Sequence, residues 1–236
     1  MDVSLDKIWK SVRRRHYFPE LPAPRYSKGQ ARVGLDIEDK HILISRDFVR
    51  QMSLRLDAKE VIEGLLDHAV SHYLYCPWDL ATHFKLYAEA KSVLKDKEMA
   101  RKATDYFMDV VADTSCVSQK ETSLPNLYRH LDRGLVDGAI HALLQQIWGI
   151  NLGVDAHQDI SRKLSRLPYL DRASWPRSIR RFCGALQSLL EMEKNDPASS
   201  NLPRPMGQHK LGQYSPEEIR VIILRITRGE LKNRKG

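Results

Sequence analysis

The chain of 236 residues has only three cysteines, Cys76, Cys116 and Cys183. An odd number of widely spaced cysteines does not supply the paired framework of a small disulfide-rich domain, and it fits a reducing compartment. No apolar run approaches the roughly 20 residues that a membrane-spanning helix needs. The first residues also lack the apolar core of a signal peptide. We therefore expect a cytoplasmic protein that is not embedded in a membrane.

Recognisable nucleic-acid modules and internal repeats are missing as well. There is no paired zinc-finger spacing, no Gly–aromatic strand motif and no clear helix-turn-helix. The net charge is nevertheless +8, with basic clusters at 13–15, 177–181 and 232–235. Excess positive charge favours polyanions through counterion release, although solvated helix faces explain such clusters equally well. The sequence thus predicts at most weak binding to polyanions such as nucleic acid, and it carries no signal of oligomeric state.

The apolar pattern predicts strands early and helices afterwards. Alternating residues at 33–37 and 42–44, separated by a polar turn at 36–40, predict a β-hairpin. Spacing close to 3.6 residues predicts helices over 4–16, 58–75, 80–94, 98–116, 129–149, 157–167, 177–194 and 216–229, with a further helical stretch from 47 to 52. Asp57 and Glu60 predict a capping box at the start of the second of these helices. Pro125 predicts a loop, and the prolines and glycines of 195–216 predict a linker.

This order predicts the α+β class, with a small early β-sheet and a mostly helical C-terminal half. We expect one domain over residues 1–130. Residues 131–236 would then form a helical C-terminal region that contains the Pro-rich linker.

Two histidines four residues apart are the most informative feature. His68 and His72 lie in the segment Leu65-Leu66-Asp67-His68-Ala69-Val70-Ser71-His72. On a helix, this spacing places both imidazoles on one face, one turn apart. Two histidines at i and i+4 can bind one metal ion, as in the zinc motif H-E-x-x-H. Because histidine pairs at this spacing also arise by chance, the motif alone does not establish a metal site.

A second helix supplies carboxylates for such a site. Asp105, Asp109 and Asp113 recur every four residues on an otherwise apolar helix. Like charges at this spacing repel each other, and a cation held between them and the histidines would relieve the repulsion. One carboxylate can then bind the metal while its neighbour orients a histidine through the other ring nitrogen. The common alternative is a solvated acidic face. Cys76, four residues after His72, is a further candidate for the third ligand.

These segments together resemble the zincin metallopeptidases, in particular the small gluzincin-like ones. In that family a strand pair precedes a helix bearing H-E-x-x-H, and a later helix carries E-x-x-x-D or a related acidic pattern. The resemblance covers about residues 30–118 and implies a zinc ion bound by His68 and His72. It further implies Asp109 as third ligand and Asp113 as its outer partner, although Asp113 can itself be the ligand in a different register. The expected activity is hydrolysis of peptide bonds in a polypeptide substrate.

Two departures from the family pattern affect this expectation. Asp109 stands where glutamate is commoner, which shortens the reach by one methylene. Ala69 stands where the family has its general-base glutamate, which takes a proton from the attacking water. Losing such a base typically costs about 10²–10⁴ in rate, so we expect this chain to be inactive.

Two explanations of Ala69 compete: a natural pseudoprotease, or a Glu→Ala change introduced to trap an enzyme. The intact ligands favour the introduced change, because natural loss of activity more often erodes the ligands too. The alternative function is a non-catalytic zincin-like protein that acts as a basic binding or scaffold module for a protein partner or nucleic acid.

Overall fold

The computed structural model describes residues 4–27, 32–35, 41–77 and 79–196, together with positions 217, 220, 221 and 224. Its elements follow in the order α1 (Leu5–Arg15), β1 (Arg25–Ser27), β2 (Val33–Leu35), β3 (Ile42–Ser45), α2 (Arg46–Met52), α3 (Ala58–Leu74), α4 (Leu80–Leu94), α5 (Lys97–Gln119), α6 (Leu124–His130), α7 (Leu135–Trp148), α8 (Gln158–Leu164), the 3₁₀ helix η1 (Arg172–Ser174) and α9 (Trp175–Asn195). The predicted class is confirmed, since the fold is α+β, mostly helical, with a small early sheet.

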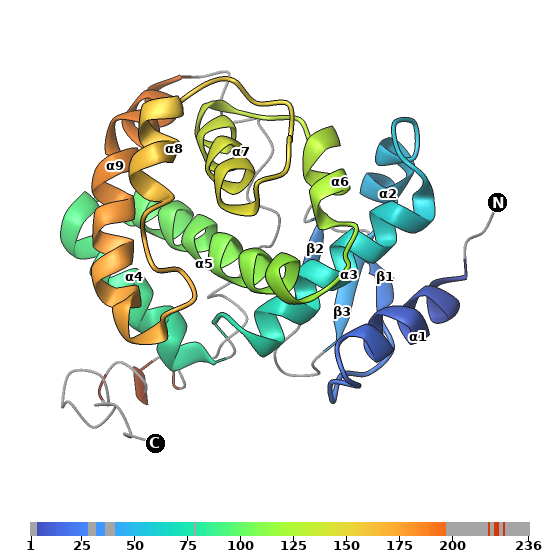
Figure 1. The fold of residues 1–236 in the computed structure, drawn as a ribbon. Helices are drawn as coiled ribbons and strands as arrows, with labels where there is room; N and C mark the ends of the chain where they lie inside the picture. The colour runs from blue at the N-terminus through green and yellow to red at the C-terminus, as the bar shows by residue number, and fades with distance from the viewer. Residues whose placement is uncertain are drawn as a thin grey trace.

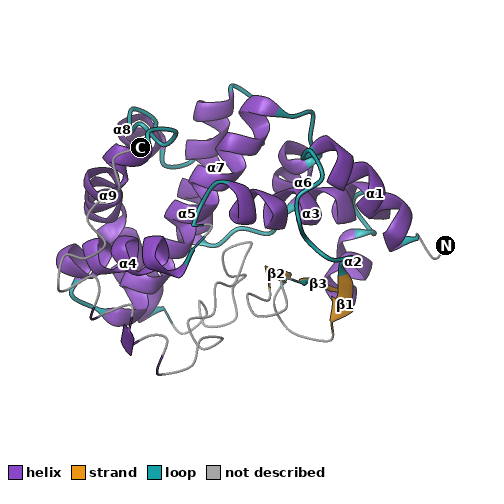
Figure 2. Ribbon diagram, turned by 90° about the horizontal axis from the view of Figure 1, so that it is seen from below, coloured by secondary structure: helices purple, strands orange, loops and turns teal. Residues whose placement is uncertain are grey.

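The sheet has three strands in the order β1-β3-β2. Strands β2 and β3 pair antiparallel, with Val33 opposite Ile44, as predicted for the hairpin. The predicted turn at 36–40 lies outside the described residues. Strand β1 was not expected from the sequence, and it pairs parallel to β3 with Tyr26 opposite Ile44. Figures 1 and 2 show the sheet at one end of the molecule beside α1, α2 and α3.

Helices α3 and α5 position the candidate site. Helix α3 begins where the Asp57 side chain accepts a hydrogen bond from the Lys59 backbone N–H, so the predicted N-cap is confirmed. Glu60 does not complete a capping box and accepts instead from the side-chain amide of Asn126. Helix α5 packs against α3 and runs through the middle of the molecule (Figure 1). A Cβ added at Gly64 of α3 would lie 2.9 Å from the Leu127 side chain, so glycine permits the close approach of α6.

The C-terminal half packs on the other end of α5. Helix α9 contacts α4 and α5, while α8 packs on α7 and α9. Figure 2 shows α4, α8 and α9 gathered at the end of the molecule opposite the sheet. The buried apolar residues of both halves form one cluster that extends from Ile8 to Leu190. Within the described residues, no helix is both long and apolar enough to cross a membrane.

Two sequence expectations in this region are wrong. The single helix expected over 129–149 is broken at 131–134, so α6 and α7 are separate. The backbone N–H of Gly134 donates to the Asp137 carboxylate and starts α7, while Leu131 and Leu135 continue the apolar spacing across the break. Pro125 does not mark a loop, because it lies in the first turn of α6, where its missing N–H costs no hydrogen bond. Most of the predicted linker and final helix lies outside the described residues, although positions 217, 220, 221 and 224 are helical.

Candidate metal centre

The structure brings His68 and His72 of α3 together with Asp109 of α5. Nε2 of His72 lies 3.1 Å from Nε2 of His68 and 3.1 Å from Oδ1 of Asp109. Nε2 of His68 lies 3.8 Å from the same Asp109 oxygen. Donor atoms bound to one tetrahedral zinc ion at about 2.0–2.1 Å are separated by roughly 3.3 Å. The three separations bracket this value, so the three atoms lie close enough together to bind a single divalent cation.

The other nitrogen of each ring is already engaged. Nδ1 of His68 lies 2.9 Å from Oδ1 and 3.1 Å from Oδ2 of Asp113. Nδ1 of His72 donates to the backbone carbonyl oxygen of Cys76. A carbonyl oxygen only accepts hydrogen bonds, so Nδ1 of His72 carries the proton, and the Asp113 carboxylate selects the same tautomer for His68. Both Nε2 atoms then face Asp109, and either a proton on one ring or a cation between the three groups would satisfy them.

Burial separates this cluster from a solvated acidic face. His68 is fully buried, and His72 and Asp109 are only 3% and 2% exposed. Burial alone would lower the pKa of His68, but the charge and hydrogen bond of Asp113, aided by Asp109, outweigh it and raise that pKa. The centre thus favours a positive charge on or beside His68. The histidine and carboxylate groups are of types that can hold a metal ion.

Asp113 lies on the outer side of His68 rather than in the cluster. Its Oδ2 accepts a hydrogen bond from the Tyr128 hydroxyl at 2.6 Å, while Oδ1 faces the histidine. Such a carboxylate–histidine pair fixes the orientation of a metal-binding ring. The sequence left open whether Asp109 or Asp113 is the third ligand. In the structure, Asp109 lies beside both Nε2 atoms, whereas Asp113 lies on the Nδ1 side of His68.

Cys76 takes part through its carbonyl oxygen and not through its thiol. Burial raises the pKa of the Cys76 thiol well above its usual range, and the nearby Asp109 charge adds to the shift. The Cys76 sulfur is also not among the atoms that converge with His68, His72 and Asp109. Ala69, at the position of the family's general base, is 3% exposed and belongs to the apolar core.

Two charged residues around the centre were not assigned roles from the sequence. Asp105 is buried, and its Oδ1 has no hydrogen-bond partner among the described residues. Burial and the neighbouring Asp109 raise the pKa of Asp105 well above its usual range. Arg32 lies just before β2. Burial lowers the pKa of its guanidinium, and the negative charges of Asp137 and, to a smaller extent, Asp109 oppose that shift. Arg32 lies 36 residues before His68 in the sequence, and no spacing signals its approach.

His83, on α4, also lies near the centre. Burial lowers its pKa to about 4, and the neighbouring His72 adds to the shift. His83 therefore stays neutral at neutral pH. In the sequence it is one of several scattered histidines, and no pattern distinguishes it from the others.

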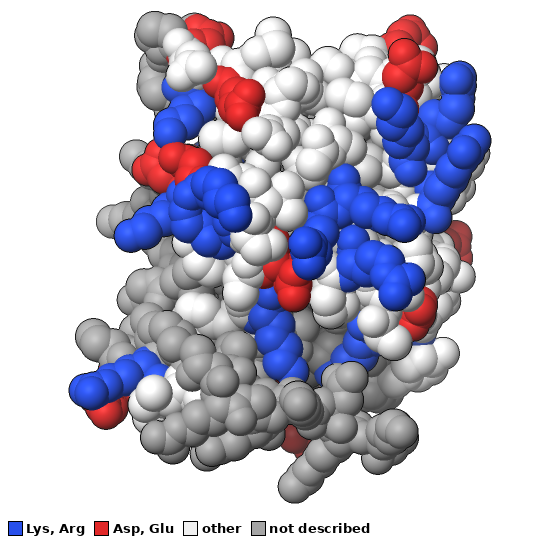
Figure 3. Space-filling view, turned by 90° about the vertical axis from the view of Figure 1, so that its left-hand side faces the viewer, with Lys and Arg blue, Asp and Glu red and all other residues white. Residues whose placement is uncertain are grey.

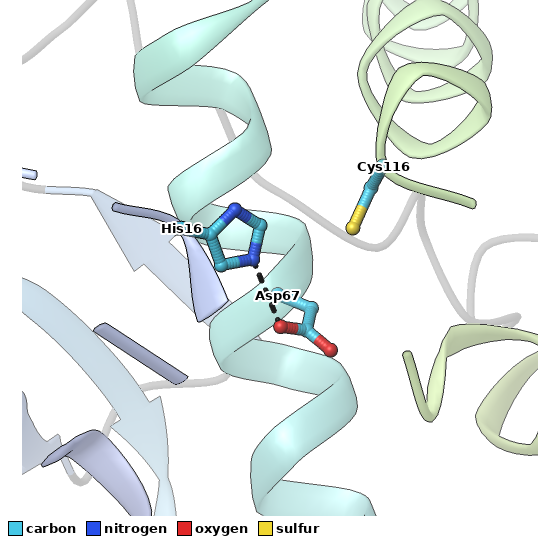
Figure 4. Close-up of side chains that lie close together, drawn as sticks. All are labelled: His16, Asp67 and Cys116. Carbon is cyan, nitrogen blue, oxygen red and sulfur yellow. Dashed lines mark hydrogen bonds and ion pairs between the residues drawn. The ribbon is translucent and has the colours of Figure 1, made fainter. Parts of the chain in front are cut away.

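A second buried group of metal-binding residue types lies nearby, with Asp67 on α3, Cys116 on α5 and His16 just after α1. Figure 4 shows His16, Asp67 and Cys116 close together, with the His16 ring hydrogen-bonded to the Asp67 carboxylate. Both Asp67 oxygens already accept hydrogen bonds, Oδ1 from His16 Nε2 at 3.0 Å and Oδ2 from the Thr122 hydroxyl. Burial raises the pKa of the Cys116 thiol to about 12, and Asp67 adds to the shift. The Asp67 carboxylate is thus engaged without an ion, although His16 Nδ1 has no hydrogen-bond partner among the described residues. We infer that this group braces α1 against α3.

Comparison with known proteins adds no relative. No protein-family model, curated protein or solved structure matches the chain. The functional argument therefore depends on the chemistry of the centre itself.

Proposed function

We propose that the chain is a zincin-like domain that binds one zinc ion through His68, His72 and Asp109, and that it does not hydrolyse peptides in its present sequence. One observation carries the proposal: three acceptor atoms converge while the outer nitrogens of both rings are held by Asp113 and the Cys76 carbonyl. Imidazole and carboxylate ligands in this number suit zinc. The order of the early sheet, the histidine helix and the acidic helix supports the relation to zincins.

Held by His68, His72 and Asp109, a zinc ion would supply Lewis-acid activation of a peptide carbonyl. The chain's own residues would orient the ligands through Asp113, Tyr128 and Cys76. At position 69, however, a methyl group can neither accept nor return a proton. The proposal is therefore a peptidase-type centre in which Ala69 removes the base.

A second candidate is a non-catalytic module in which the metal stabilises the fold. It is favoured by the burial of the centre, since His68, His72, Asp109 and Ala69 are each at most 3% exposed. Structural zinc sites are closed, whereas catalytic sites keep an open position. Both candidates require the same ion and differ in whether a base at position 69 creates an activity.

Metal content tests the binding. Elemental analysis of the purified chain should find about one zinc per chain, and dialysis against a chelator should remove it and lower the melting temperature. His72→Ala should lose the metal, because two of three ligands hold zinc weakly. His130→Ala, on α6 and outside the cluster, is the matched control and should keep it. A folded His72→Ala variant that binds zinc as tightly as the original chain would refute the proposed centre.

Peptide cleavage separates the two candidates. The zinc-loaded original chain should not cleave casein, and Ala69→Glu should gain activity if the centre is of the peptidase type. Glutamine has the size of glutamate but lacks a carboxylate that can act as a base, so Ala69→Gln should stay inactive. If Ala69→Glu folds and binds zinc yet cleaves nothing, the structural role of the metal is favoured.

A further inference from the structure

A strongly basic segment lies at the end of the molecule far from the sheet. Seven of the eight charged residues between positions 160 and 190 are basic: Arg162, Lys163, Arg166, Arg172, Arg177, Arg180 and Arg181. The single acid, Asp171, caps η1 by accepting hydrogen bonds from the Ala173 backbone N–H and the Ser174 hydroxyl. The segment therefore carries most of the chain's net positive charge.

The fold presents all seven side chains to solvent. Each is exposed, whereas Ile179, Phe182 and Leu186 of α9 face the core. Arg177, Arg180 and Arg181 therefore lie on the outer side of α9, with Arg177 one helical turn before the other two. Figure 3 shows this side of the molecule, with Lys and Arg spread across its described surface and fewer acidic residues between them. We call the surface of α8, η1 and the first half of α9 the basic face.

Among the described residues, few close ion pairs neutralise the charges of Arg162, Lys163, Arg166, Arg177, Arg180 and Arg181. Arg180 lies 3.8 Å from Glu89, and Arg162 lies 3.9 Å from Asp159, and these long exposed pairs contribute little. Across the described part of the chain, ion pairs are absent for Lys163, Arg166, Arg177 and Arg181. A partner that brings regularly spaced negative charge would therefore gain these interactions without breaking strong ones.

The composition of the face favours phosphates of a nucleic acid over a membrane. Six of the seven cations are arginine, whose planar fork can donate two hydrogen bonds to one phosphate. Amphipathic segments that bind a membrane surface gain affinity from inserted apolar side chains as well as from charge. Between residues 160 and 190, Leu170 is the one large apolar side chain that the described structure exposes, at 59%.

We propose that the basic face binds the sugar-phosphate backbone of a nucleic acid, without reading its sequence. Contacts to phosphates fix position and carry no sequence information. This inference does not depend on the metal centre, since none of the residues of the face belongs to it.

Anisotropy titrations of the full chain test the proposal, using a labelled 20-base-pair duplex of mixed sequence in DNA and RNA forms. The test variant is Arg166→Gln/Arg177→Gln/Arg181→Gln. The matched control is Lys7→Gln/Lys10→Gln/Arg14→Gln, which removes the same charge from exposed positions of α1. We expect the test variant to bind at least tenfold more weakly at about 0.1 M salt. Its slope of log affinity against log salt should fall by about one for each phosphate that the variant no longer neutralises, and the control should change affinity less than threefold.

Several results would overturn the assignment. One is the absence of binding by the original chain at low salt, and another is an equal loss in both triple variants, which would indicate net charge alone. Tight binding to phosphatidylserine vesicles together with no binding to either duplex would assign the face to a membrane. Arg→Lys replacements at the same three positions keep the charge and lose the fork, so they should reduce affinity only severalfold. Circular dichroism establishes that each variant is folded.

Discussion

Nδ1 of His68 lies 2.9 Å from Oδ1 of Asp113, and the Tyr128 hydroxyl donates to the other oxygen of the same carboxylate at 2.6 Å. Three elements are thereby connected, because His68 is on α3, Asp113 on α5 and Tyr128 on α6. The chain of hydrogen bonds fixes the tautomer of His68 and directs its Nε2 toward His72 and Asp109. Asp113 and Tyr128 therefore determine how well His68 is oriented to bind a cation.

Asp113→Asn should weaken zinc binding by about 10–100-fold while leaving the three inner ligands in place. The amide is neutral, so it stabilises the oriented ring less than the carboxylate does. Tyr128→Phe should have a smaller effect, because it removes one hydrogen bond and keeps the charge. Competition with a chromogenic chelator measures both affinities. Unchanged affinity in a folded Asp113→Asn variant would mean that the pair serves only packing.

Zinc binding at pH 7 should release protons. The pKa of His68 is raised above its usual value by Asp113 and Asp109 in spite of burial, so a proton competes with the metal for Nε2. Apparent affinity should then rise with pH through the pKa of His68, because only the neutral ring binds metal. Calorimetry in two buffers of different ionisation enthalpy counts the protons released. Asp113→Asn should lower the count, since the charge that raises the pKa is gone.

The hydrogen-bonded group at His16 predicts a purely structural effect. In Asp67→Asn, the amide retains one acceptor oxygen for two donors, the buried His16 Nε2 and the half-buried Thr122 hydroxyl. An unsatisfied buried donor costs roughly 1–3 kcal/mol, so urea unfolding should show a loss of that size. The matched control, Asp132→Asn, breaks an exposed pair with Arg55 and should cost less than about 1 kcal/mol. Zinc content should stay the same in both variants.

Sequence reasoning anticipated those parts of the centre that depend on helix periodicity. The spacing of His68 and His72, and of Asp109 and Asp113, fixes which side chains share a face, and two apolar helices have to bury those faces against each other. It did not anticipate Arg32, whose charge interacts with that of Asp109 from the segment just before β2. Contacts between remote segments leave no local pattern, and neither does a backbone carbonyl such as that of Cys76.

The break between α6 and α7 shows a second limit of sequence reasoning. The apolar spacing of Leu131 and Leu135 is that of a continuous helix. The hydrogen bond from the Gly134 backbone N–H to the Asp137 carboxylate, which starts α7, is seen only in the structure. Periodicity therefore predicts which residues are buried better than it predicts where a helix restarts.

His141 should make the protein less stable in acid. Its Nδ1 accepts a hydrogen bond from Arg133 Nε at 2.9 Å, and burial lowers its pKa to about 3, with the charges of Arg133 and Arg32 adding to the shift. The folded protein keeps this ring neutral, whereas the unfolded chain binds a proton below its usual pKa of about 6.5. The free energy of unfolding attributable to His141 is therefore fully present above pH 6.5. It falls as the pH drops from 6.5 toward 3.

His141→Asn tests this origin of acid sensitivity, because the amide oxygen can still accept from Arg133 and does not titrate. Its smaller side chain should lower stability by a constant amount at every pH, and only the slope is diagnostic. Between pH 6 and pH 4.5, urea unfolding should show a shallower decline than in the original chain, by up to about 1.4 kcal/mol per pH unit. Parallel curves for the two proteins would assign the acid sensitivity to other groups, of which His83 comes first because its pKa is also lowered, to about 4, by burial and by His72.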